Sequence, residues 1–558
     1  MMPPPNSKSY CGSFPQGDVD SFNERGQCAM LCVHSIEPER TTMNGAESLV
    51  KTLVAEGVTV CFTNPGTSEM HFVAALDRIP GMRCVLGLFE GVVTGAADGY
   101  YRIAGKPAST LLHLGPGLGN GLANLHNAKK ANSGIVNIVG EHATYHVKYD
   151  APLTSDIEGV ARPMSHWVRK ARSSTSVSAD AAAAISVAKE LPGKIATLIL
   201  PADTAWGPAE HVVAAQASTP RRSVSSTAVT AAAQALQRGG ASSCLLLGDV
   251  GTRGRSLELA GRIAAKTGCV ISGEFNSSRL ERGAGRVQLS RVPYVIELAT
   301  KMFEKTSELV LAGAKAPVAF FAYPNKPSLM APDSCHVTEL ASIEEDIEAA
   351  LEAVATELGA LNTPPARVAQ AVRPALPNGA ITPEGIGAVL GALLPENAIV
   401  VDESVTSGRG FNQPTIGAPP HDWLSIMGGA IGFGFPCATG AAVAAPDRKV
   451  VLLEGDGSGM YTVQALWTMA RNGLDVTMLV FANRSYQILR GELAGVGAGT
   501  PGKNATDMLT LDRPDIDWVS LAKGHGVEGG RATTLEELAK EFKRGIASSG
   551  PYLIEVVL

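Results

Sequence analysis

The sequence predicts an α/β protein built from three doubly wound parallel-sheet domains. From residue 44 onward, segments with helical periodicity alternate with short apolar runs that are typical of buried strands. Such alternation is the pattern of parallel sheets covered by helices on both faces. Two Pro-containing polar stretches, residues 214–226 and 363–379, interrupt the pattern and indicate linkers. A chain of 558 residues is also too long for one hydrophobic core, which agrees with several domains.

The bulk composition excludes several classes of protein. Hydrophobic residues make up 45% of the chain, which also has 60 Gly and 34 Pro, as in globular proteins with many short turns. The net charge of −6 comes without a basic block, so we expect no nucleic-acid partner and no membrane partner. No apolar run is long enough to cross a bilayer. The nine cysteines lack metal-binding spacing, as free thiols in a reducing compartment do, so we expect a cytoplasmic protein.

Residues 1–42 differ from the rest of the chain. They are rich in Pro, Ser, Asn and Gly and have neither helical nor strand periodicity. The apolar run at residues 28–33 is too short for an export signal, and the five acidic residues argue against a transit peptide. We therefore predict a disordered N-terminal extension, with the fold beginning at Met43. An unrecognised targeting peptide is the alternative.

The first unit begins with an amphipathic helix at residues 46–56 and a buried strand at 58–62. Pro65 and Gly66 follow the strand as a pair typical of a tight turn. Thr67 comes next, where a hydroxyl residue either caps the following helix or binds a ligand.

Two polar residues of the first unit stand at element boundaries. Glu90 lies between an apolar run and a small-residue helix at 91–102, where a Glu is either a helix N-terminal residue or an acid of a site. His113 lies at the end of an apolar strand at 108–114, a position that more commonly holds a core histidine. The glycines after it do not form the dinucleotide-binding pattern GxGxxG, because Asn120 stands three positions after Gly117.

The second unit has predicted strands at 244–247, 270–271 and 309–311 and carries no comparable motif. The third unit, from about residue 381, begins with a strand at 398–401 that leads to Glu403 and Ser404. A glycine-rich stretch at 427–436 follows and contains Gly429 and Ile431.

The strongest motif is a magnesium–diphosphate anchor in the third unit. An apolar strand at 449–454 breaks into a glycine turn that contains Asp456, and a second strand at 476–482 leads to Asn483. Hard oxygen ligands suit Mg²⁺, and the glycine backbone with a helix N-terminus suits a diphosphate. An ordinary glycine-rich turn of a parallel sheet is the structural alternative.

Together these motifs resemble the thiamine-diphosphate enzyme family, which includes benzoylformate decarboxylase, pyruvate decarboxylase and acetolactate synthase. The resemblance covers essentially everything after residue 42. It implies the thiamine-diphosphate-enzyme fold, with a pyrimidine-binding domain at 43–215, a central domain at 225–362 and a diphosphate-binding domain at 378–558. It also implies thiamine diphosphate and Mg²⁺ as cofactors. We expect no FAD, because the central segment has no counterpart of the family's FAD-binding domain.

The same resemblance assigns roles to individual residues. Glu90 would hydrogen-bond the pyrimidine of the cofactor, His113 would handle protons at the substrate, and Thr67 would bind the substrate carboxylate. The metal ligands would be Asp456, Asn483 and the Ser485 carbonyl. The residues that would contact the cofactor are Pro65, Gly66, Glu403, Ser404, Gly429, Ile431, Gly457, Ser458 and Tyr486. Ile488 and Glu492 would shape the substrate pocket. The chain departs from benzoylformate decarboxylase in having no histidine at 316–323 and from pyruvate decarboxylase in lacking its HH pair, so proton handling should differ.

The activity implied is non-oxidative decarboxylation of a 2-oxo acid with carboligase capacity, through ylid addition to the carbonyl, CO₂ loss and enamine protonation. An acetolactate synthase-type catalytic subunit is the second reading, and a non-catalytic cofactor-binding paralogue is the third. The family also implies a homo-oligomer, a dimer or tetramer, with the active site at a subunit interface. The sequence does not identify the 2-oxo acid.

Overall fold

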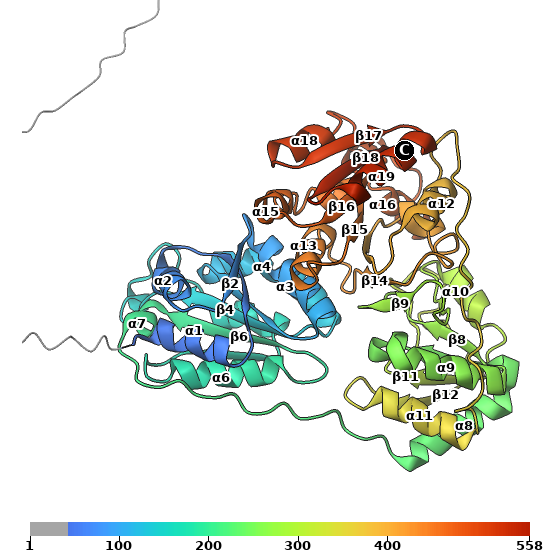
Figure 1. Cartoon of the computed structure of the whole chain (residues 1–558), viewed down its shortest axis with the longest axis horizontal. Coiled ribbons are helices and arrows are strands. Elements are labelled where there is room, and N and C mark those ends of the chain that lie inside the picture. The colour runs from blue at the N-terminus through green and yellow to red at the C-terminus, as the bar shows by residue number, and fades with distance from the viewer. Residues whose placement is uncertain (1–42) are drawn as a thin grey trace, which may run out of the picture. The chain divides into compact units, whose positions relative to one another are not determined.

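The computed structural model describes residues 43–558, so the predicted extension at residues 1–42 lies outside the described residues. Three sheets organise the described part of the chain, and all but one of the strand pairings within them are parallel (Figure 1). The predicted fold class is therefore confirmed.

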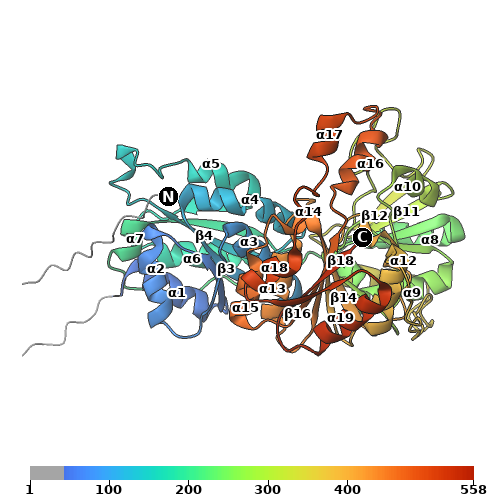
Figure 2. The same cartoon turned by 90° about the horizontal axis from the view of Figure 1, so that it is seen from above.

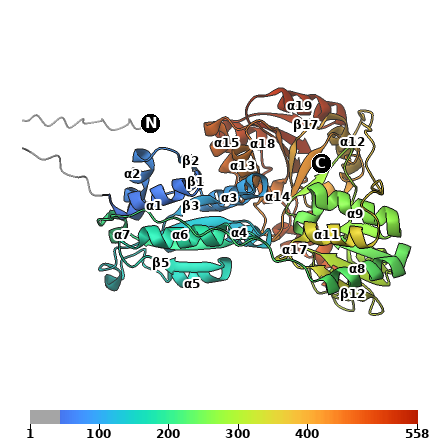
Figure 3. The same cartoon turned by 60° about the horizontal axis from the view of Figure 1, so that its bottom comes forward.

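The first sheet has six parallel strands in the order β2-β1-β3-β4-β6-β5. Its strands are β1 (Val60–Asn64), β2 (Arg83–Leu86), β3 (Ala108–Leu112), β4 (Ile135–Glu141), β5 (Trp167–Lys170) and β6 (Ile195–Pro201). Its helices are α1 (Gly45–Ala55), α2 (Met70–Arg78), α3 (Glu90–Ala104), α4 (Leu114–Lys130), α5 (Ile157–Ala161), α6 (Val177–Ala188) and α7 (Ala202–Trp206). Helices α1 and α6 pack on one face of this sheet and α3 and α4 pack on the other, and a separate apolar cluster lies at each face (Figure 3). Because both faces are covered, β3, β4 and β6 are buried along their whole length.

Helix α1 begins at a capping box. The Asn44 side chain accepts a hydrogen bond from the Glu47 backbone N–H at 2.8 Å, and the Glu47 carboxylate accepts one from the Asn44 N–H at 3.2 Å. Both donors would otherwise lack intrahelical partners, so this pair fixes where the first helix starts.

The central sheet has five parallel strands in the order β10-β8-β7-β11-β12. Its strands are β7 (Ser243–Leu247), β8 (Val270–Gly273), β10 (Ser290–Arg291), β11 (Glu308–Ala312) and β12 (His336–Ala341). The helices of this segment are α8 (Ser226–Gly239), α9 (Gly254–Thr267), α10 (Ile296–Phe303) and α11 (Ile347–Glu357). Its apolar core is separate from those of the other two sheets.

The third sheet has seven strands in the order β17-β18-β16-β15-β13-β14-β9. Its own strands are β13 (Ile399–Glu403), β14 (His421–Ser425), β15 (Val450–Gly455), β16 (Val476–Ala482), β17 (Glu528–Ala532) and β18 (Tyr552–Val557). Its helices are α12 (Pro383–Leu393), α13 (Gly434–Ala444), α14 (Asp456–Gly459), α15 (Ala465–Asn472), α16 (Gln487–Gly495), α17 (Lys503–Met508), α18 (Trp518–Gly524) and α19 (Leu535–Ala547). Helices α16 and α17 contain no buried residue and lie apart from the sheet (Figure 2).

The seventh strand comes from the central segment, which the sequence pattern does not predict. β9 (Leu280–Arg282) pairs antiparallel with β14 at the edge of the third sheet. The Arg282 guanidinium lies 4.8 Å from the centre of the Trp423 ring and donates to the Asn412 carbonyl at 2.7 Å. β9 has only three residues, and side-chain contacts with residues distant in the sequence hold it in place. It is therefore too short to show the periodicity that predicts a strand. The domain boundaries drawn from the sequence stay predictions.

Helix α3 packs closely against α13 because small residues line the contact. A Cβ on Gly99 would lie 2.1 Å from the Cys437 carbonyl oxygen, and one on Gly440 would lie 1.8 Å from the Ala96 carbonyl oxygen. Neither position therefore tolerates a side chain without backbone movement. This contact joins the helix that begins at Glu90 to the glycine-rich segment of the third sheet.

Candidate functional site

The predicted metal site lies where two neighbouring parallel strands end. β15 and β16 pair in parallel, Asp456 begins α14 directly after β15, and Asn483 follows β16. The buried Asp456 carboxylate accepts hydrogen bonds from the backbone N–H groups of Gly457 at 2.8 Å and Arg484 at 2.6 Å. The Asn483 amide oxygen accepts from the Ser485 N–H at 3.0 Å. Backbone donors therefore orient both side chains at one end of the sheet.

The chemistry of these donors fits a magnesium–diphosphate group. Burial raises the pKa of Asp456 to about 6, although the Arg484 and Gly457 N–H groups act in the opposite direction. A cation beside this carboxylate would offset the cost of burying its charge. Among residues 43–558 no cluster of three His, Cys, Asp or Glu could hold a metal ion. A metal held here would therefore rely on the carboxylate, the amide oxygen, backbone carbonyls and oxygens of a ligand, a set that suits Mg²⁺.

The turn that carries Asp456 leaves little free space. A Cβ on Gly457 would lie 2.6 Å from the Cε1 atom of Tyr486, so this close approach requires glycine. The Ser458 hydroxyl donates to Glu454 at 2.7 Å, and the Tyr486 N–H donates to the Leu509 carbonyl at 3.1 Å. Since both groups are engaged within the protein, their contacts with a diphosphate stay predictions.

Glu403 lies beneath the glycine-rich segment. Its carboxylate accepts hydrogen bonds from the N–H groups of Gly432 at 2.9 Å and Gly434 at 2.5 Å. The segment before them contains exposed Gly429, with a left-handed φ of 73°, and half-buried Ile431. The structure thus places Glu403 where it fixes the backbone of this segment, and direct contact of Glu403 with a cofactor stays a prediction.

Glu403 also faces a second buried carboxyl group, that of Glu454. Burial raises the pKa of Glu403 to about 7, and burial together with the charge of Glu403 raises the pKa of Glu454. Two like charges cannot both be ionised cheaply at such a place, so the pair holds a proton near neutrality. The neighbouring Ser404 hydroxyl donates to Asp402 at 2.5 Å, and Ser404 itself is buried.

Glu90 is the first residue of α3, and it is buried. Its carboxylate accepts a hydrogen bond from the Asn120 side chain at 3.0 Å, which comes from α4. A Cβ on Gly117 would lie 2.9 Å from Glu90 Oε1 and 3.4 Å from the Cβ of His113. Because Gly117 has no side chain, Glu90 of α3 and His113 can both lie against the first turn of α4.

His113 is the N-cap residue of α4, not part of β3, which ends one residue earlier. Its Nδ1 atom lies 2.8 Å from a carboxylate oxygen of Glu69. Glu69 is almost fully buried, and burial raises its pKa, although His113 acts to lower it. The same carboxylate accepts the Gly66 N–H at 2.7 Å. A carboxylate fixed in this way orients the imidazole and sets which ring nitrogen carries a proton.

Sequence reasoning missed Glu69. The sequence offers one signal for it: Glu69 stands three positions after the N-cap residue Gly66, a spacing typical of a helix-capping interaction. A Cβ on Gly66 would lie 2.2 Å from His113 Nδ1, so Pro65 and Gly66 shape the approach of the ring to the turn. Thr67, the next residue, is exposed. The structure thus brings the predicted Pro65–Thr67 turn and His113 together through Glu69.

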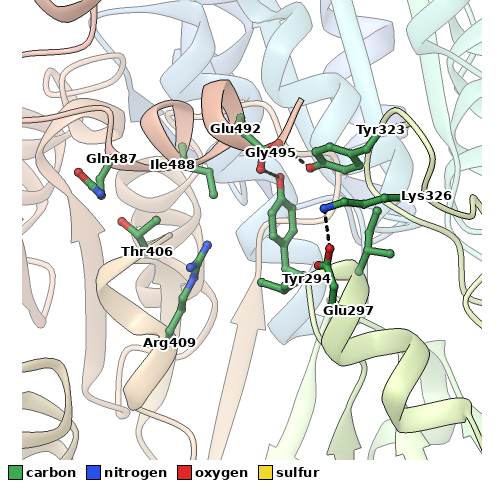
Figure 4. A pocket seen from close by; sticks show the side chains of 13 residues that line it. Tyr294, Glu297, Tyr323, Lys326, Thr406, Arg409, Gln487, Ile488, Glu492 and Gly495 are labelled. Atoms are coloured by element: carbon green, nitrogen blue, oxygen red, sulfur yellow. Dashed lines mark hydrogen bonds and ion pairs between the residues drawn. The ribbon is translucent and has the colours of Figure 1, made fainter. Parts of the chain in front are cut away.

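Ile488 and Glu492 both line one cavity of ≈ 280 Å³ (Figure 4). The Glu492 carboxylate accepts hydrogen bonds from the hydroxyls of Tyr294 at 2.8 Å and Tyr323 at 2.5 Å. The two tyrosines come from the central segment, and the sequence pattern gives no signal for them.

Within residues 43–558, none of the helices combines the length and the apolar character needed to cross a bilayer.

Family models match both ends of the described chain. Residues 43–163 match the N-terminal TPP-binding domain of thiamine pyrophosphate enzymes, and residues 411–556 match their C-terminal TPP-binding domain.

Individual relatives match almost the whole chain. A Mycobacterium tuberculosis protein provisionally named acetolactate synthase large subunit IlvX is 52% identical over 517 residues, which cover 92% of this chain and 99% of the relative. Benzoylformate decarboxylase of Pseudomonas aeruginosa is 30% identical, over 90% of this chain and 96% of the relative. The solved structure of a Rhodococcus jostii thiamine diphosphate-dependent 4-hydroxybenzoylformate decarboxylase is similar in fold, with a TM-score of 0.81 at 24% identity over 92% of this chain and 98% of that one.

Proposed function

The chain belongs to the thiamine pyrophosphate enzyme family, and from this premise we propose that it is a thiamine diphosphate- and Mg²⁺-dependent decarboxylase that acts non-oxidatively on a 2-oxo acid. The observation that carries the proposal is the His113–Glu69 pair, because His113 and Glu90 both lie next to Gly117 in the first turn of α4. Decarboxylation without ligation ends when the substrate carbon takes up a proton. A positioned histidine supplies such a proton near neutral pH.

The bound cofactor supplies the nucleophile that adds to the substrate carbonyl and the electron sink that makes CO₂ loss possible. Asp456, Asn483 and the Ser485 carbonyl would hold Mg²⁺, and the turn at Gly457 would lie against the diphosphate. Glu90 would hydrogen-bond a pyrimidine nitrogen, and the Asn120 side chain orients its buried carboxyl group.

The Gly429 carbonyl would accept a hydrogen bond from the pyrimidine amino group of the cofactor, and Ile431 would support the bent conformation of the cofactor. The shape of the segment that contains both residues depends on Glu403, which binds the backbone N–H groups of Gly432 and Gly434. Thr67 would bind the substrate carboxylate, since it follows the Gly66 turn that contacts His113. We propose a homo-oligomer, a dimer or a tetramer, with the active site at a subunit interface, and a cytoplasmic location.

An acetolactate synthase-type condensation of two 2-oxo acids is the second candidate. The 52% identical relative, which carries that provisional name, favours it. The same cofactor contacts serve both reactions, and only the acceptor differs: a proton in decarboxylation and a second 2-oxo acid in condensation.

One assay separates these candidates. The purified protein, loaded with thiamine diphosphate and Mg²⁺, is given a panel of 2-oxo acids, and CO₂ release is measured together with aldehyde and acetolactate formation. We expect CO₂ and aldehyde in equal amounts. Acetolactate as the main product from pyruvate would support condensation instead. Tight cofactor binding without CO₂ from any acid would indicate a non-catalytic paralogue.

A further inference from the structure

The cavity lined by Ile488 and Glu492 is large enough for part of a small-molecule ligand, such as the side chain of a 2-oxo acid. Its volume of ≈ 280 Å³ lies just below the range of roughly 300–1,000 Å³ for small-ligand pockets. One wall comes from α16 and from the loop after β13, with Thr406 and Arg409, and the other comes from the central segment, with Tyr294, Tyr323 and Lys326 (Figure 4).

The charged groups of the cavity are not equally paired. The Lys326 ammonium forms an ion pair with Glu297 at 2.6 Å and lies 5.2 Å from the centre of the Tyr323 ring. The Glu492 carboxylate, in contrast, accepts hydrogen bonds from the two phenols alone within residues 43–558. Burial and the nearby Glu492 raise the pKa of both tyrosines, so each remains a neutral donor. Among the lining residues, Glu492 is thus the carboxylate whose charge no cation balances.

Arg409 does not balance that charge. In Figure 4 it lies near Ile488 and Thr406, and no hydrogen bond or ion pair joins it to Glu492 or to another lining side chain. It belongs to the loop that follows Glu403 and Ser404, two residues for which the sequence predicts contact with the cofactor. The negatively charged diphosphate of a bound cofactor would give the Arg409 guanidinium a partner of its own.

The Glu492 carboxylate is held in one position yet can accept further donors. Each oxygen receives one phenol, and a carboxylate has about four acceptor sites in all. The Tyr294 ring is itself fixed by packing against Phe275 and Phe320, at centroid distances of 5.5 and 5.6 Å. A charge held in place in this way recognises a ligand at a lower entropic cost than a mobile one.

We infer that Glu492 selects 2-oxo acids whose side chain ends in a cationic hydrogen-bond donor, such as a guanidinium or an ammonium group. The inference rests on the proposed decarboxylase function. The cation would complete the acceptor sites of Glu492, and the aromatic faces of Tyr294 and Tyr323 beside it would also favour a positive charge.

Three linear 2-oxo acids of equal length test this selection: one ends in guanidinium, one in urea and one in isobutyl. They share shape and differ in charge and in donor groups. For the protein loaded with thiamine diphosphate and Mg²⁺, we expect kcat/KM to favour the guanidinium acid over both others by on the order of ten- to a hundredfold. Glu492→Gln keeps the size, retains one acceptor oxygen for a phenol and offers its N–H₂ group as a donor to the other phenol. It should bring the three values within a few fold. Glu297→Gln, which changes the paired acid of the same cavity, should preserve the preference.

The possible results separate this inference from the proposed function. Turnover of the isobutyl acid at least as fast as the guanidinium acid, or an unchanged preference in Glu492→Gln, overturns the selection and leaves the decarboxylase in place. If none of the three acids releases CO₂, calorimetric titration of the loaded protein with the same acids measures the preference directly. Equal binding of all three, or no binding, overturns the inference, whereas the absence of CO₂ from a wider panel overturns the function.

Discussion

The cofactor end and the substrate end of the proposed site are built in different ways. At the cofactor end, Asp456 and Asn483 follow adjacent strands, and backbone N–H groups fix their side chains. At the substrate end, Glu492 is fixed by the side chains of Tyr294 and Tyr323, which lie 198 and 169 residues away in the sequence. One end thus depends on the sheet, and the other depends on contacts between separate segments.

This difference indicates where the chain can change its substrate. Substitutions on the exposed helix α16 or in the central segment alter the cavity without moving β15 or β16. Substitutions at the strand ends change the geometry on which every reaction of the cofactor would depend. Loss of all activity should therefore follow changes at the cofactor end, and altered preference should follow changes at the substrate end.

The largest effect is expected from Asp456→Ala. The variant removes the carboxylate from a site that offers few other charged ligands, so retention of thiamine diphosphate and Mg²⁺ should be abolished. Calorimetric titration with both ligands measures this, and Asp77→Ala, at an exposed position of α2, is the control. Unchanged affinity in Asp456→Ala would remove the basis for the metal site.

Glu90→Gln should leave cofactor affinity nearly intact and slow every cofactor-dependent step. The amide cannot exchange a proton with the pyrimidine, so turnover should fall by roughly 10² to 10⁴. Proton-exchange NMR on the bound cofactor should show the same loss. Normal exchange in the variant would assign Glu90 a structural role at the start of α3.

His113→Ala provides the contrast to Glu90→Gln, because His113 would act only on the substrate. Its turnover should fall by a similar factor, roughly 10² to 10⁴, while proton exchange of the cofactor remains. Glu69→Gln should shift the pH dependence of turnover without abolishing it, since Glu69 contacts the His113 ring and would act through it. Equal loss of exchange in His113→Ala and Glu90→Gln would contradict this division.

The sequence was informative where function depends on local backbone. The ends of β15 and β16 and the start of α3 follow from apolar periodicity and glycine turns, so Asp456, Asn483 and Glu90 could be identified as candidates. The three parallel sheets follow from the same alternation of elements.

The sequence was silent where function depends on side chains from distant segments. Nothing near Glu492 indicates Tyr294 or Tyr323, and nothing near Glu403 indicates that its acidic neighbour is Glu454. The edge strand β9 likewise depends on the contacts of Arg282. Such pairings are properties of the tertiary structure, and a single sequence contains no pattern that encodes them.

The pH dependence of metal binding gives a further test of the cofactor end. Burial raises the pKa of Asp456 to about 6 in the metal-free protein, and only the ionised carboxylate binds a cation. Mg²⁺ affinity should therefore be constant above that pH and fall by about tenfold per unit as the pH drops below it. Titrations between roughly pH 5 and pH 8 measure the midpoint. A flat profile would mean that Asp456 does not bind the metal.

The smallest effect is expected from Glu454→Gln, which tests whether the buried carboxyl pair beneath the cofactor end costs stability. The folded-state pKa of Glu403 is raised to about 7 from 4.5, and that of Glu454 is raised as well. The folded protein therefore holds protons that the unfolded chain has already lost in this window. Its free energy of unfolding should fall as the pH rises from 4.5 through about 7.

Glu454→Gln removes one of the two acids and leaves Glu403 with its two backbone donors. The cofactor-free variant should match the wild type at low pH and exceed it above neutrality, by on the order of 1–3 kcal/mol. Chemical unfolding at roughly pH 5 and pH 8 compares the two. The same gain at both pH values would show that packing, and not a shared proton, distinguishes the variant. A gain confined to high pH would show that burying Glu403 beside Glu454 costs stability at the cofactor end, where Glu403 binds the backbone N–H of Gly432. At the substrate end, Glu492 avoids this cost because its partners are neutral phenols and not a second acid.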